Sequence, residues 1–480
     1  MLFNSTEFML FLPCVFAAYW TLSRSVRAQN LFIVAASYLF YGWWDFRFLA
    51  LIAFTSSLSY ATGLVELRRS GKQPSKAVLA VSLAANLGIL GYFKYCGFFV
   101  DSFIRLARAV GFTQMESSVA LEVVLPVGIS FYTFQALSYS IDVYRRQIRP
   151  VRDPLVFFAF ISFFPQLVAG PIERAASLLP QFTRPRTFDY PAAVDGCRQM
   201  LWGFFKKCIV ADSCAVVSNS LLDGGAGGNG VAAWLGALMF AFQIYGDFSG
   251  YSDIAIGCAR LFGIGLRRNF AFPYFSRDIA EFWRRWHMSL TTWFRDYMYI
   301  PLGGSRCGTS RRIANVFAIF LASGLWHGAN WTFVLWGAFH AVLFLLLMLF
   351  GGNRRNMGAP AEGRALPNAK EALQMAATFL LAVLGWTIFR AQSVGEAFSW
   401  LKAMFNPLSF AALHGLPREL GLAAGGTVAM LSVEWIARCR GHALENMPRR
   451  RTVRWAVYYL LVWLCVFMTP GSQSFIYFRF

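Results

Sequence analysis

The sequence predicts an all-α, polytopic transmembrane protein with roughly ten to twelve membrane elements. Hydrophobic residues make up 57% of its 480 residues and charged residues only 14%, which leaves too little polar surface for a soluble protein of this length. Apolar runs that approach or reach the length of a membrane-spanning helix recur along the whole chain. They cover residues 8–22, 32–44, 48–64, 77–92, 123–144, 155–168, 231–244, 313–325, 331–350, 373–388, 420–435 and 455–468.

Several of these runs are short or end in polar residues, so we expect some elements to be re-entrant or interfacial rather than fully spanning. The longest polar connections, at 173–192 and 351–371, are too short for a separate soluble domain. The chain is therefore predicted to form a single integral membrane domain over residues 1–480. Polar and charged residues interleave densely with aromatic residues from about Asp247 to Asn330, and the functional core is expected within residues 245–345.

The net charge of +20 is explained by a membrane rather than by nucleic acid. Arginine and lysine cluster in short loops after the first, third and fifth apolar runs, so that every second loop is basic. Such loops face the cytoplasm, which places the N-terminus outside. Arg449, Arg450, Arg451 and Arg454 precede the last apolar run, and the C-terminus is therefore expected to be extracytoplasmic as well.

The motifs of several enzyme classes are missing from the sequence. The nine cysteines form no CxxC pair, and no group of His, Cys, Asp and Glu has the spacing of a metal site, so no metal is predicted. Neither a glycine-rich phosphate loop nor a G-x-S-x-G nucleophile elbow occurs. From composition alone, a transporter or flippase of an envelope precursor remains an alternative to an enzyme, although the inverted repeats of transporters are not evident.

Two segments of the middle third carry unusual polarity. The segment DFSGYSDIAIG (247–257) places two acids in an apolar context. The segment 278–304 has apolar residues at helical spacing, with arginines between them, before a Pro–Gly–Gly stop. It is predicted to be one aromatic and cationic helix that lies at the interface or lines a cavity, because it is too polar to cross lipid alone.

The segment SGLWHGANW (323–331) places His327 inside an apolar run. Ionisable residues within membrane segments are costly and mark functional sites. Asn330, three residues on, is expected to share a helix face with His327 and to orient its ring or bind a substrate oxygen. Gly324 and Gly328 would let a backbone or a ligand approach closely. The alternative is a neutral histidine bonded to a helix carbonyl.

Four other histidines occur in the chain. His287 lies in the dense polar and aromatic stretch and is a second candidate for the site. His340 lies in an apolar span and is expected to be mainly a packed core residue. His414 and His442 lie near turns or basic loops and are expected to be solvated.

A neutral histidine in a dry cavity suits acyl transfer. Its pKa can lie near ambient pH, so it can accept a proton from a hydroxyl that attacks a thioester or an ester. The transfer also requires donor and acceptor to be held together away from water. Arg284, Arg285 and Arg295 are candidates to bind an anionic donor.

Five blocks of the sequence resemble the membrane-bound O-acyltransferase (MBOAT) family. The similarity is to its bacterial branch, which includes the membrane proteins of alginate O-acetylation, peptidoglycan O-acetylation and teichoic-acid D-alanylation. The blocks span most of the chain in the expected order: FFPQLVAGPIER (163–174), YGDFSGYSDIAIG (245–257), FWRRWHMSLTTWFRDYMYIPLGG (282–304), GLWHGANWTFVLWGAFHA (324–341) and FIYFRF (475–480).

The resemblance implies a helical membrane core around a central tunnel, located in the bacterial inner membrane with lipid around it. It implies that His287 and His327 are the family's two histidines, with His327 the catalytic one. Asn330, Trp326 and Asp296 are then expected to shape the site.

By the same resemblance the acyl donor is cytoplasmic acetyl-CoA, with no bound cofactor, and the final acceptor is an extracytoplasmic polysaccharide. A separate SGNH-type or similar acetyltransferase is the expected partner that completes the transfer. A lipid or protein acceptor is the narrower alternative. By similarity to D-alanylation systems, Tyr477 in the C-terminal FIYFRF could carry the acyl group, and an aromatic anchor at the membrane interface is the other interpretation of this tail.

Overall fold

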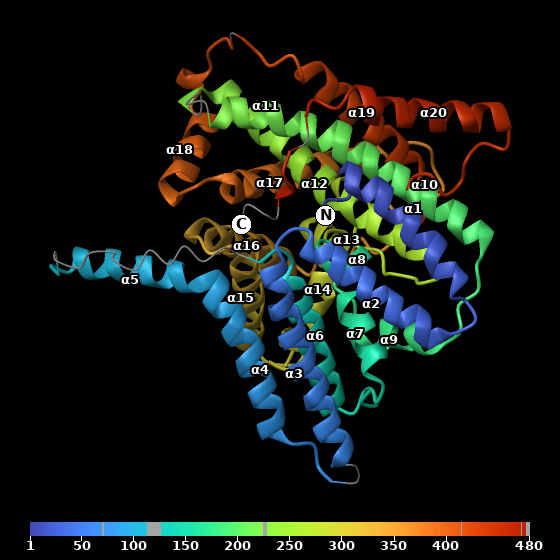
Figure 1. The fold of residues 1–480 in the computed structure, drawn as a ribbon. Coiled ribbons are helices and arrows are strands. Elements are labelled where there is room, and N and C mark those ends of the chain that lie inside the picture. Colours follow the sequence, from blue (N-terminus) through green and yellow to red (C-terminus); the bar gives the residue numbers. More distant parts are fainter. Residues whose placement is uncertain (70–71, 113–125, 224–227, 414, 472, 477–480) are drawn as a thin grey trace. The chain divides into compact units, whose positions relative to one another are not determined.

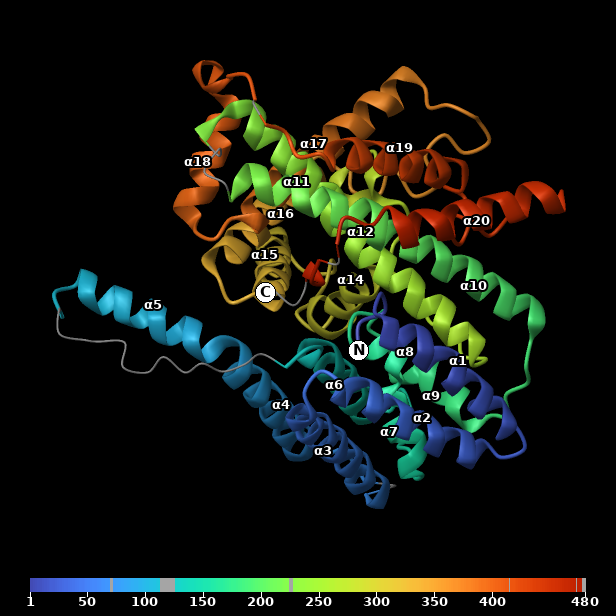
Figure 2. The ribbon, with the colours of Figure 1, turned by 45° about the horizontal axis from the view of Figure 1, so that its top comes forward.

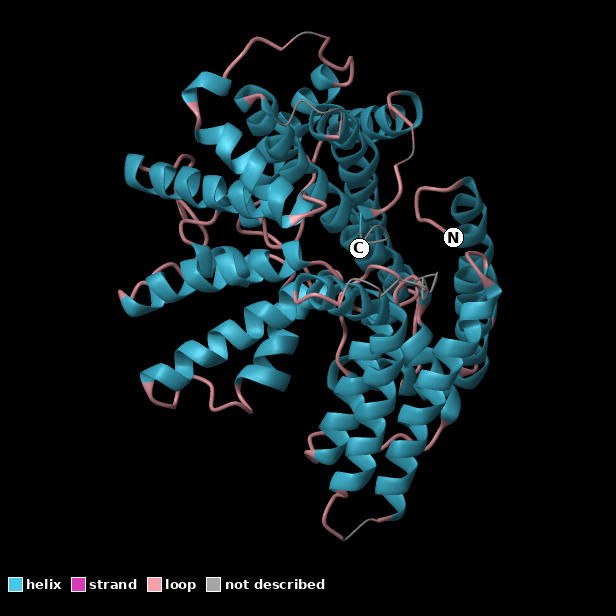
Figure 3. Ribbon diagram, turned by 90° about the vertical axis from the view of Figure 1, so that its left-hand side faces the viewer, coloured by secondary structure: helices cyan, strands magenta, loops and turns pink. Residues whose placement is uncertain are grey.

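The computed structural model describes residues 1–69, 72–112, 126–223, 228–413, 415–471 and 473–476 (Figure 1). Every regular element among these residues is a helix, as Figure 3 shows. The predicted all-α class is therefore confirmed. The chain divides into two compact units, residues 1–188 and 189–480, and the expected catalytic core at 245–345 falls in the second. That the two units act as a single domain stays a prediction.

Five helical segments are long and apolar enough to cross a membrane, among the residues described: Phe46–Arg68, Lys76–Ala109, Gly230–Leu261, Trp331–Leu349 and Ala369–Arg390. Two shorter apolar helices, Thr6–Thr21 and Leu420–Ile436, add to them. Fewer full spans are found than the ten to twelve predicted elements because several apolar runs are broken or short. The run at 155–168, for example, is interrupted at Phe163 between two helices of nine and four residues.

The first unit contains nine α-helices in its described part, with short helical turns at Phe46–Phe48 and Gly91–Tyr95. They are α1 (Thr6–Thr21), α2 (Val26–Gly42), α3 (Leu49–Arg68), α4 (Lys76–Leu90), α5 (Cys96–Ala109), α6 (Ile129–Tyr144), α7 (Pro154–Ser162), α8 (Phe164–Leu167) and α9 (Ala175–Thr183). Side-chain caps start several of them; Ser5, Ser25 and Ser75 each accept a backbone N–H of the first turn.

The second unit contains eleven α-helices in its described part, and it holds every histidine that the structure describes. They are α10 (Tyr190–Phe205), α11 (Asp212–Leu222), α12 (Gly230–Leu261), α13 (Ile279–Arg285), α14 (Met288–Phe294), α15 (Thr309–His327), α16 (Trp331–Leu349), α17 (Ala369–Arg390), α18 (Val394–Phe405), α19 (Leu420–Ile436) and α20 (Arg451–Phe467). Two π-helical turns, η3 (Lys206–Ala211) and η6 (Arg295–Tyr299), and two 3-10 turns, Pro273–Phe275 and Pro407–Ser409, complete it.

The long helix α12 is the centre of the second unit, and α10, α11, α17 and α18 pack on it (Figure 2). Glycine pairs let α10 and α12 touch backbone to backbone. A Cβ on Gly203 would lie 2.6 Å from the carbonyl oxygen of Gly250, and one on Gly196 would lie 2.6 Å from that of Gly257. Small residues at such crossings are typical of helix packing in membranes. The glycines of the 247–257 segment thus bring α10 close to α12.

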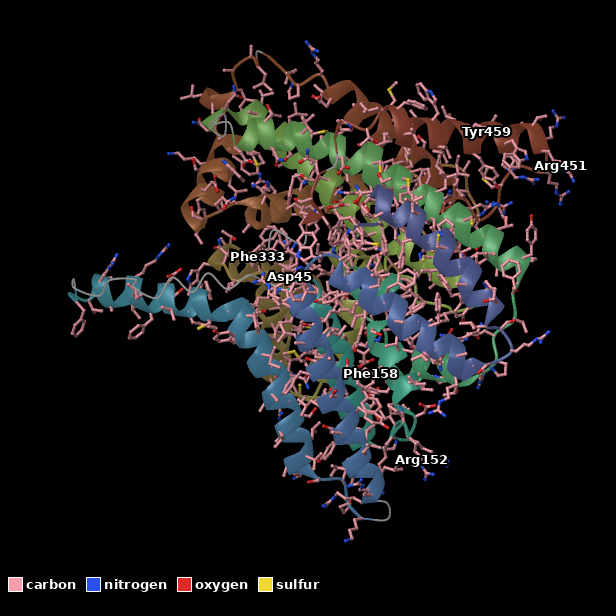
Figure 4. All side chains as sticks on the ribbon, in the orientation of Figure 1. Asp45, Arg152, Phe158, Phe333, Arg451 and Tyr459 are labelled. Carbon is pink, nitrogen blue, oxygen red and sulfur yellow. The ribbon has the colours of Figure 1, made fainter. Side chains whose placement is uncertain are left out.

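The last helix, α20, presents apolar side chains outward, and Leu461 is its single buried residue. Figure 4 labels Arg451 at its start and Tyr459 further along. Tyr459, Leu460 and Phe467 are all more than half exposed. Exposed apolar area of this extent is expected where a helix faces lipid.

Candidate functional site

His327 is the last residue of α15, which pairs with α16 as a helical hairpin. Two glycines make the hairpin tight. A Cβ on Gly324 would collide with the backbone carbonyl of Phe333, and one on Gly328 would collide with the Phe333 ring. Figure 4 labels Phe333. The predicted close approach at Gly324 and Gly328 is confirmed, and the approaching group is α16.

The His327 ring is buried, with 4% of the residue exposed. Three aromatic rings surround it edge-on. Their centroids lie 5.0 Å away for Trp326, 5.2 Å for Trp336 and 5.4 Å for Phe389. An imidazole in such apolar surroundings is poorly solvated.

His287 lies at a break between α13 and α14. Its backbone adopts the left-handed conformation, with φ of 41° and ψ of 54°, which is uncommon for a residue other than glycine. The break is held on both sides, because the Ala271 N–H donates to the Arg285 carbonyl at 2.9 Å and the Met288 N–H to the Asn269 carbonyl at 2.8 Å. The prediction of one continuous helix over 278–304 is therefore wrong.

Asn269 fixes the tautomer of His287. Its Oδ1 lies 3.1 Å from Nδ1 of the imidazole and also accepts the Ser289 hydroxyl at 2.9 Å, while its Nδ2 donates to Ser252 at 3.0 Å. With the amide oriented in this way, Nδ1 of His287 must be the donor. Nε2 therefore carries the lone pair, and it has no hydrogen-bond partner in the described part of the chain.

The ring of His287 is 1% exposed and lies outside the five candidate spans. Burial lowers its pKa to about 3, because desolvation disfavours the imidazolium. The ring is therefore neutral over the physiological pH range. A neutral imidazole with a free lone pair is chemically competent as a base or as a hydrogen-bond acceptor.

The two predicted site histidines meet at one indole. The ring centroids of Trp326 and His287 are 5.7 Å apart, and those of Trp326 and His327 are 5.0 Å apart. Trp336 continues the row of rings to His340, with centroids 5.0 Å apart. The fold thus gathers two segments that are about forty residues apart in sequence into one buried, aromatic-lined site.

His340 lies in the same row as a packed core residue. It is fully buried, and Trp283 and Trp336 flank it with centroids 5.0 Å away. Neither ring nitrogen has a hydrogen-bond partner among the described residues. The predicted core role of His340 agrees with this packing.

The expectation that His442 is solvated is wrong, because the residue is 3% exposed and its Nε2 lies 2.9 Å from Asp195. His414 lies outside the described residues.

Asn330 does not share a helix with His327. It is the N-cap of α16, where its Oδ1 accepts the Thr332 N–H at 3.1 Å. Its Nδ2 donates to the carbonyl of Gln392 at 2.8 Å. The expectation of a common helix face is wrong because α15 ends at His327. Asn330 instead ties the start of α16 to the segment after α17.

The arginines of α13 hold a loop of the chain. Arg284 donates to the carbonyls of Asn353 and Asn356 at 2.9 and 2.8 Å. Arg285 donates to the carbonyl of Gly358 at 2.9 Å and pairs with Glu281. Their donors are thus directed to the polar connection between α16 and α17. The expected role of both residues in binding an anionic donor stays a prediction.

Arg295 and Asp296 lie in η6 and pair with each other at 2.7 Å. The Arg295 side chain is 58% exposed. Of the three predicted donor-binding arginines, Arg295 is therefore the most accessible. Surface pairs of this kind contribute little to stability.

The two acids of the 247–257 segment are ion-pair partners of two lysines that are not among the predicted site residues, and Asp247 is buried whereas the Asp253 side chain is 17% exposed. Lys206 lies 2.5 Å from Asp253, and Lys207 lies 2.9 Å from Asp247. The signal that the sequence offers for this contact is a pair of adjacent lysines within an apolar stretch, since such charges need partners. Asn269 offered no comparable signal, since its role depends on the break at His287.

The C-terminal segment is buried against α12. Phe475 is fully buried, with ring centroids 4.2 Å from Tyr251 and 6.3 Å from Phe248. Phe248 in turn contacts His287 at 4.5 Å. Tyr477, the predicted acyl carrier, lies outside the described residues.

A family model describes the sequence over residues 93–385, that of the membrane-bound O-acyltransferase family. The match covers more than half of the chain and includes both His287 and His327. The chain therefore belongs to the membrane-bound O-acyltransferase family and is an O-acyltransferase. This membership decides between the two classes that composition left open, the enzyme and the transporter, in favour of the enzyme.

Individual relatives are similar over most of their length. A probable alginate O-acetylase of Pseudomonas putida is 42% identical over 85% of this chain and 80% of its own. The peptidoglycan O-acetyltransferase of Helicobacter pylori is 32% identical over 87% and 82%. The teichoic acid D-alanyltransferase of Bacillus subtilis is 28% identical over 47% and 59%.

The arginine contacts to the loop predict a proteolysis phenotype. Replacing Arg284 with alanine removes the donors that hold Asn353 and Asn356, and Arg354 and Arg355 between them are trypsin sites. We expect cleavage after these residues to accelerate about tenfold, the equivalent of one lost charge-assisted hydrogen bond. Limited trypsin digestion with mass spectrometry measures it. Arg295→Ala is the control, and equal acceleration in both variants would contradict the assignment.

Proposed function

We propose that this chain is a membrane O-acetyltransferase that moves an acetyl group from cytoplasmic acetyl-CoA across the membrane for O-acetylation of an extracytoplasmic polysaccharide. The observation that carries the proposal is the pair of buried histidines that contact one indole, Trp326. Relatives that are named for O-acetylation of alginate and of peptidoglycan support an acetyl group and a polysaccharide acceptor of the same type.

The chemistry proposed for the site is a proton transfer coupled to acyl transfer. The acceptor hydroxyl gives its proton to a neutral imidazole while its oxygen attacks the thioester carbonyl. A C–O bond forms and the C–S bond breaks, and the imidazolium returns the proton to the leaving thiolate. The aromatic rings around His327 exclude water that would hydrolyse the donor. His327 is the proposed general base, and Arg295 is the most accessible of the arginines proposed to bind the donor.

His287 is a second candidate for the base. The specific observation in its favour is the contact with Asn269, which leaves Nε2 as an acceptor. In this version His327 binds and orients one of the reactants. The two versions differ in which residue titrates during the reaction, and this difference is measurable.

The proposed location is the bacterial inner membrane, with both termini extracytoplasmic. The basic loops after the first, third and fifth apolar runs support this orientation. Acetyl groups then leave on the outer side, where we propose that an SGNH-type or similar acetyltransferase passes them to the polymer. A lipid or protein acceptor is the alternative that the same site chemistry allows.

Tyr477 is proposed as the covalent carrier of the acetyl group. It directly follows Ile476, which is buried within the second unit. The phenol requires a base in order to attack the thioester, and the site histidines are the candidates. Transfer would leave an O-acetyl ester on Tyr477, from which the partner takes the group.

Replacement of His327 with alanine is expected to abolish polymer acetylation while the protein still accumulates in the membrane. Loss of a general base lowers a rate by about 10²–10⁴-fold. Acetyl content of the polymer and an immunoblot of membranes measure both quantities. His340→Phe is the matched control, since neither nitrogen of His340 has a described hydrogen-bond partner, and it should keep most of the acetylation. Normal acetylation in His327→Ala would contradict the role.

Replacement of Asn269 with aspartate distinguishes the two candidate bases. A carboxylate next to Nδ1 stabilises the imidazolium and raises the pKa of His287 above its wild-type value. If His287 is the base, it becomes protonated at higher pH, and the acid limb of the pH–rate profile moves upward by about one unit or more. An unmoved limb in a folded, active variant would exclude His287 as the base. Ser289→Ala keeps the amide and should leave the limb in place.

Tyr477→Phe tests the carrier. The substitution removes only the phenolic oxygen, so polymer acetylation should fall to the level of the His327 variant. Mass spectrometry of the wild-type C-terminal peptide, after incubation with acetyl-CoA, should show one added acetyl group. Full activity of Tyr477→Phe in cells would rule out the carrier.

A further inference from the structure

Lys207 in η3 lies against three acceptors, one of which belongs to the C-terminal segment. Its Nζ lies 2.8 Å from Asp212, 2.9 Å from Asp247 and 3.0 Å from the carbonyl oxygen of Gln473. The contacts to Asp212 and Gln473 are hydrogen bonds, and the contact to Asp247 is an ion pair. Lys207 and Asp212 are each 1% exposed. Without Gln473, one donor of a buried ammonium would lose its partner.

Asp247 makes the complementary contact. Its Oδ1 binds Lys207, and its Oδ2 accepts the backbone N–H of Ile476 at 2.7 Å. The contacts to residues 473 and 476 thus use one carbonyl and one N–H of the main chain. Between them, the Phe475 ring fills a space against Tyr251 and Phe248. The site recognises an extended peptide by its backbone and by one aromatic side chain.

We infer that Lys207, Asp212 and Asp247 form a binding site, the tail seat, for the backbone of residues 473–476, and that it holds this segment beside the histidine site in a position for the proposed acyl transfer. Asp247 and Phe248 are neighbours on α12, and Phe248 contacts His287. The tail seat therefore holds Phe475 within two ring contacts of His287. The positioning part of the inference rests on the proposed function, whereas the binding site does not.

Neighbouring residues provide a matched control. Lys206 is the other buried lysine of η3, and it pairs with Asp253 of α12 and lies 3.9 Å from Glu434 of α19. Asp247→Ala and Asp253→Ala each remove one α12 carboxylate and leave the lysine one other carboxylate. Each variant thus removes one ion pair of a buried lysine of η3, and Asp247 is the one of the pair that contacts residue 476.

Hydrogen–deuterium exchange of the full-length protein in detergent tests the tail seat. In the wild type, the Ile476 amide should be protected, because it donates to a buried carboxylate. In Asp247→Ala, exchange in the C-terminal peptic peptide should accelerate about tenfold or more, the equivalent of one lost charge-assisted hydrogen bond. In Asp253→Ala it should stay at the wild-type rate. Equal rates in the two variants would overturn the inference.

A change confined to the tail covers the case in which Asp247→Ala does not fold. Ile476→Pro removes the N–H that Asp247 accepts, and the remaining amides of the C-terminal peptide should exchange faster than in Ile476→Val. If they do not, the tail seat is wrong. Tyr477→Phe should keep wild-type protection. The two hypotheses therefore fail in different experiments. If Tyr477 is not the carrier, Tyr477→Phe keeps normal acetylation; if the tail seat does not exist, Ile476→Pro keeps normal protection from exchange.

Discussion

The ion pairs between the lysines of η3 and the acids of α12 fix the interior of the second unit. Lys206 and Lys207 are adjacent, and their partners Asp253 and Asp247 are six residues apart on one helix. π-helical turns are uncommon and often occur at functional sites. Removing one partner of a buried ion pair costs about 3–5 kcal/mol, because it leaves the other charge unpaired. Such pairs constrain how the helices pack more than they add stability.

Glycines make these ion pairs possible. A Cβ on Gly246 would lie 3.0 Å from the carbonyl of Lys206, and one on Gly250 would lie 2.8 Å from that of Gly203. With the backbones in contact, both lysines reach carboxylates of α12. The same helix carries Phe248 to His287. The close packing of α12 against α10 and η3 thus places three things together: the ion pairs of the lysines, the contact of Asp247 with Ile476, and the contact of Phe248 with His287.

The sequence predicts the all-α class well, because apolar runs are a local signal of membrane helices. His287 and His327 are brought together at Trp326, as expected of one site, and their catalytic role stays a prediction. The break at His287 is not predicted, since a left-handed residue within a helical pattern is fixed by distant bonds to Asn269 and Ala271. The acceptors of Arg284 are backbone carbonyls, which have no signature in the side-chain pattern. The position of Asn330 is not predicted either, because the sequence does not show that α15 ends at His327 and that α16 begins after Asn330.

The proposed acyl-transfer site joins His287 and His327 at Trp326. Chloroacetyl-CoA tests it directly, since an imidazole placed at the acyl carbon displaces the chloride and keeps the adduct. Peptide mass spectrometry of the purified, full-length protein should place the adduct on His327 or His287, and excess acetyl-CoA should prevent its formation. Adducts that are confined to other residues, and that acetyl-CoA does not prevent, would contradict the account.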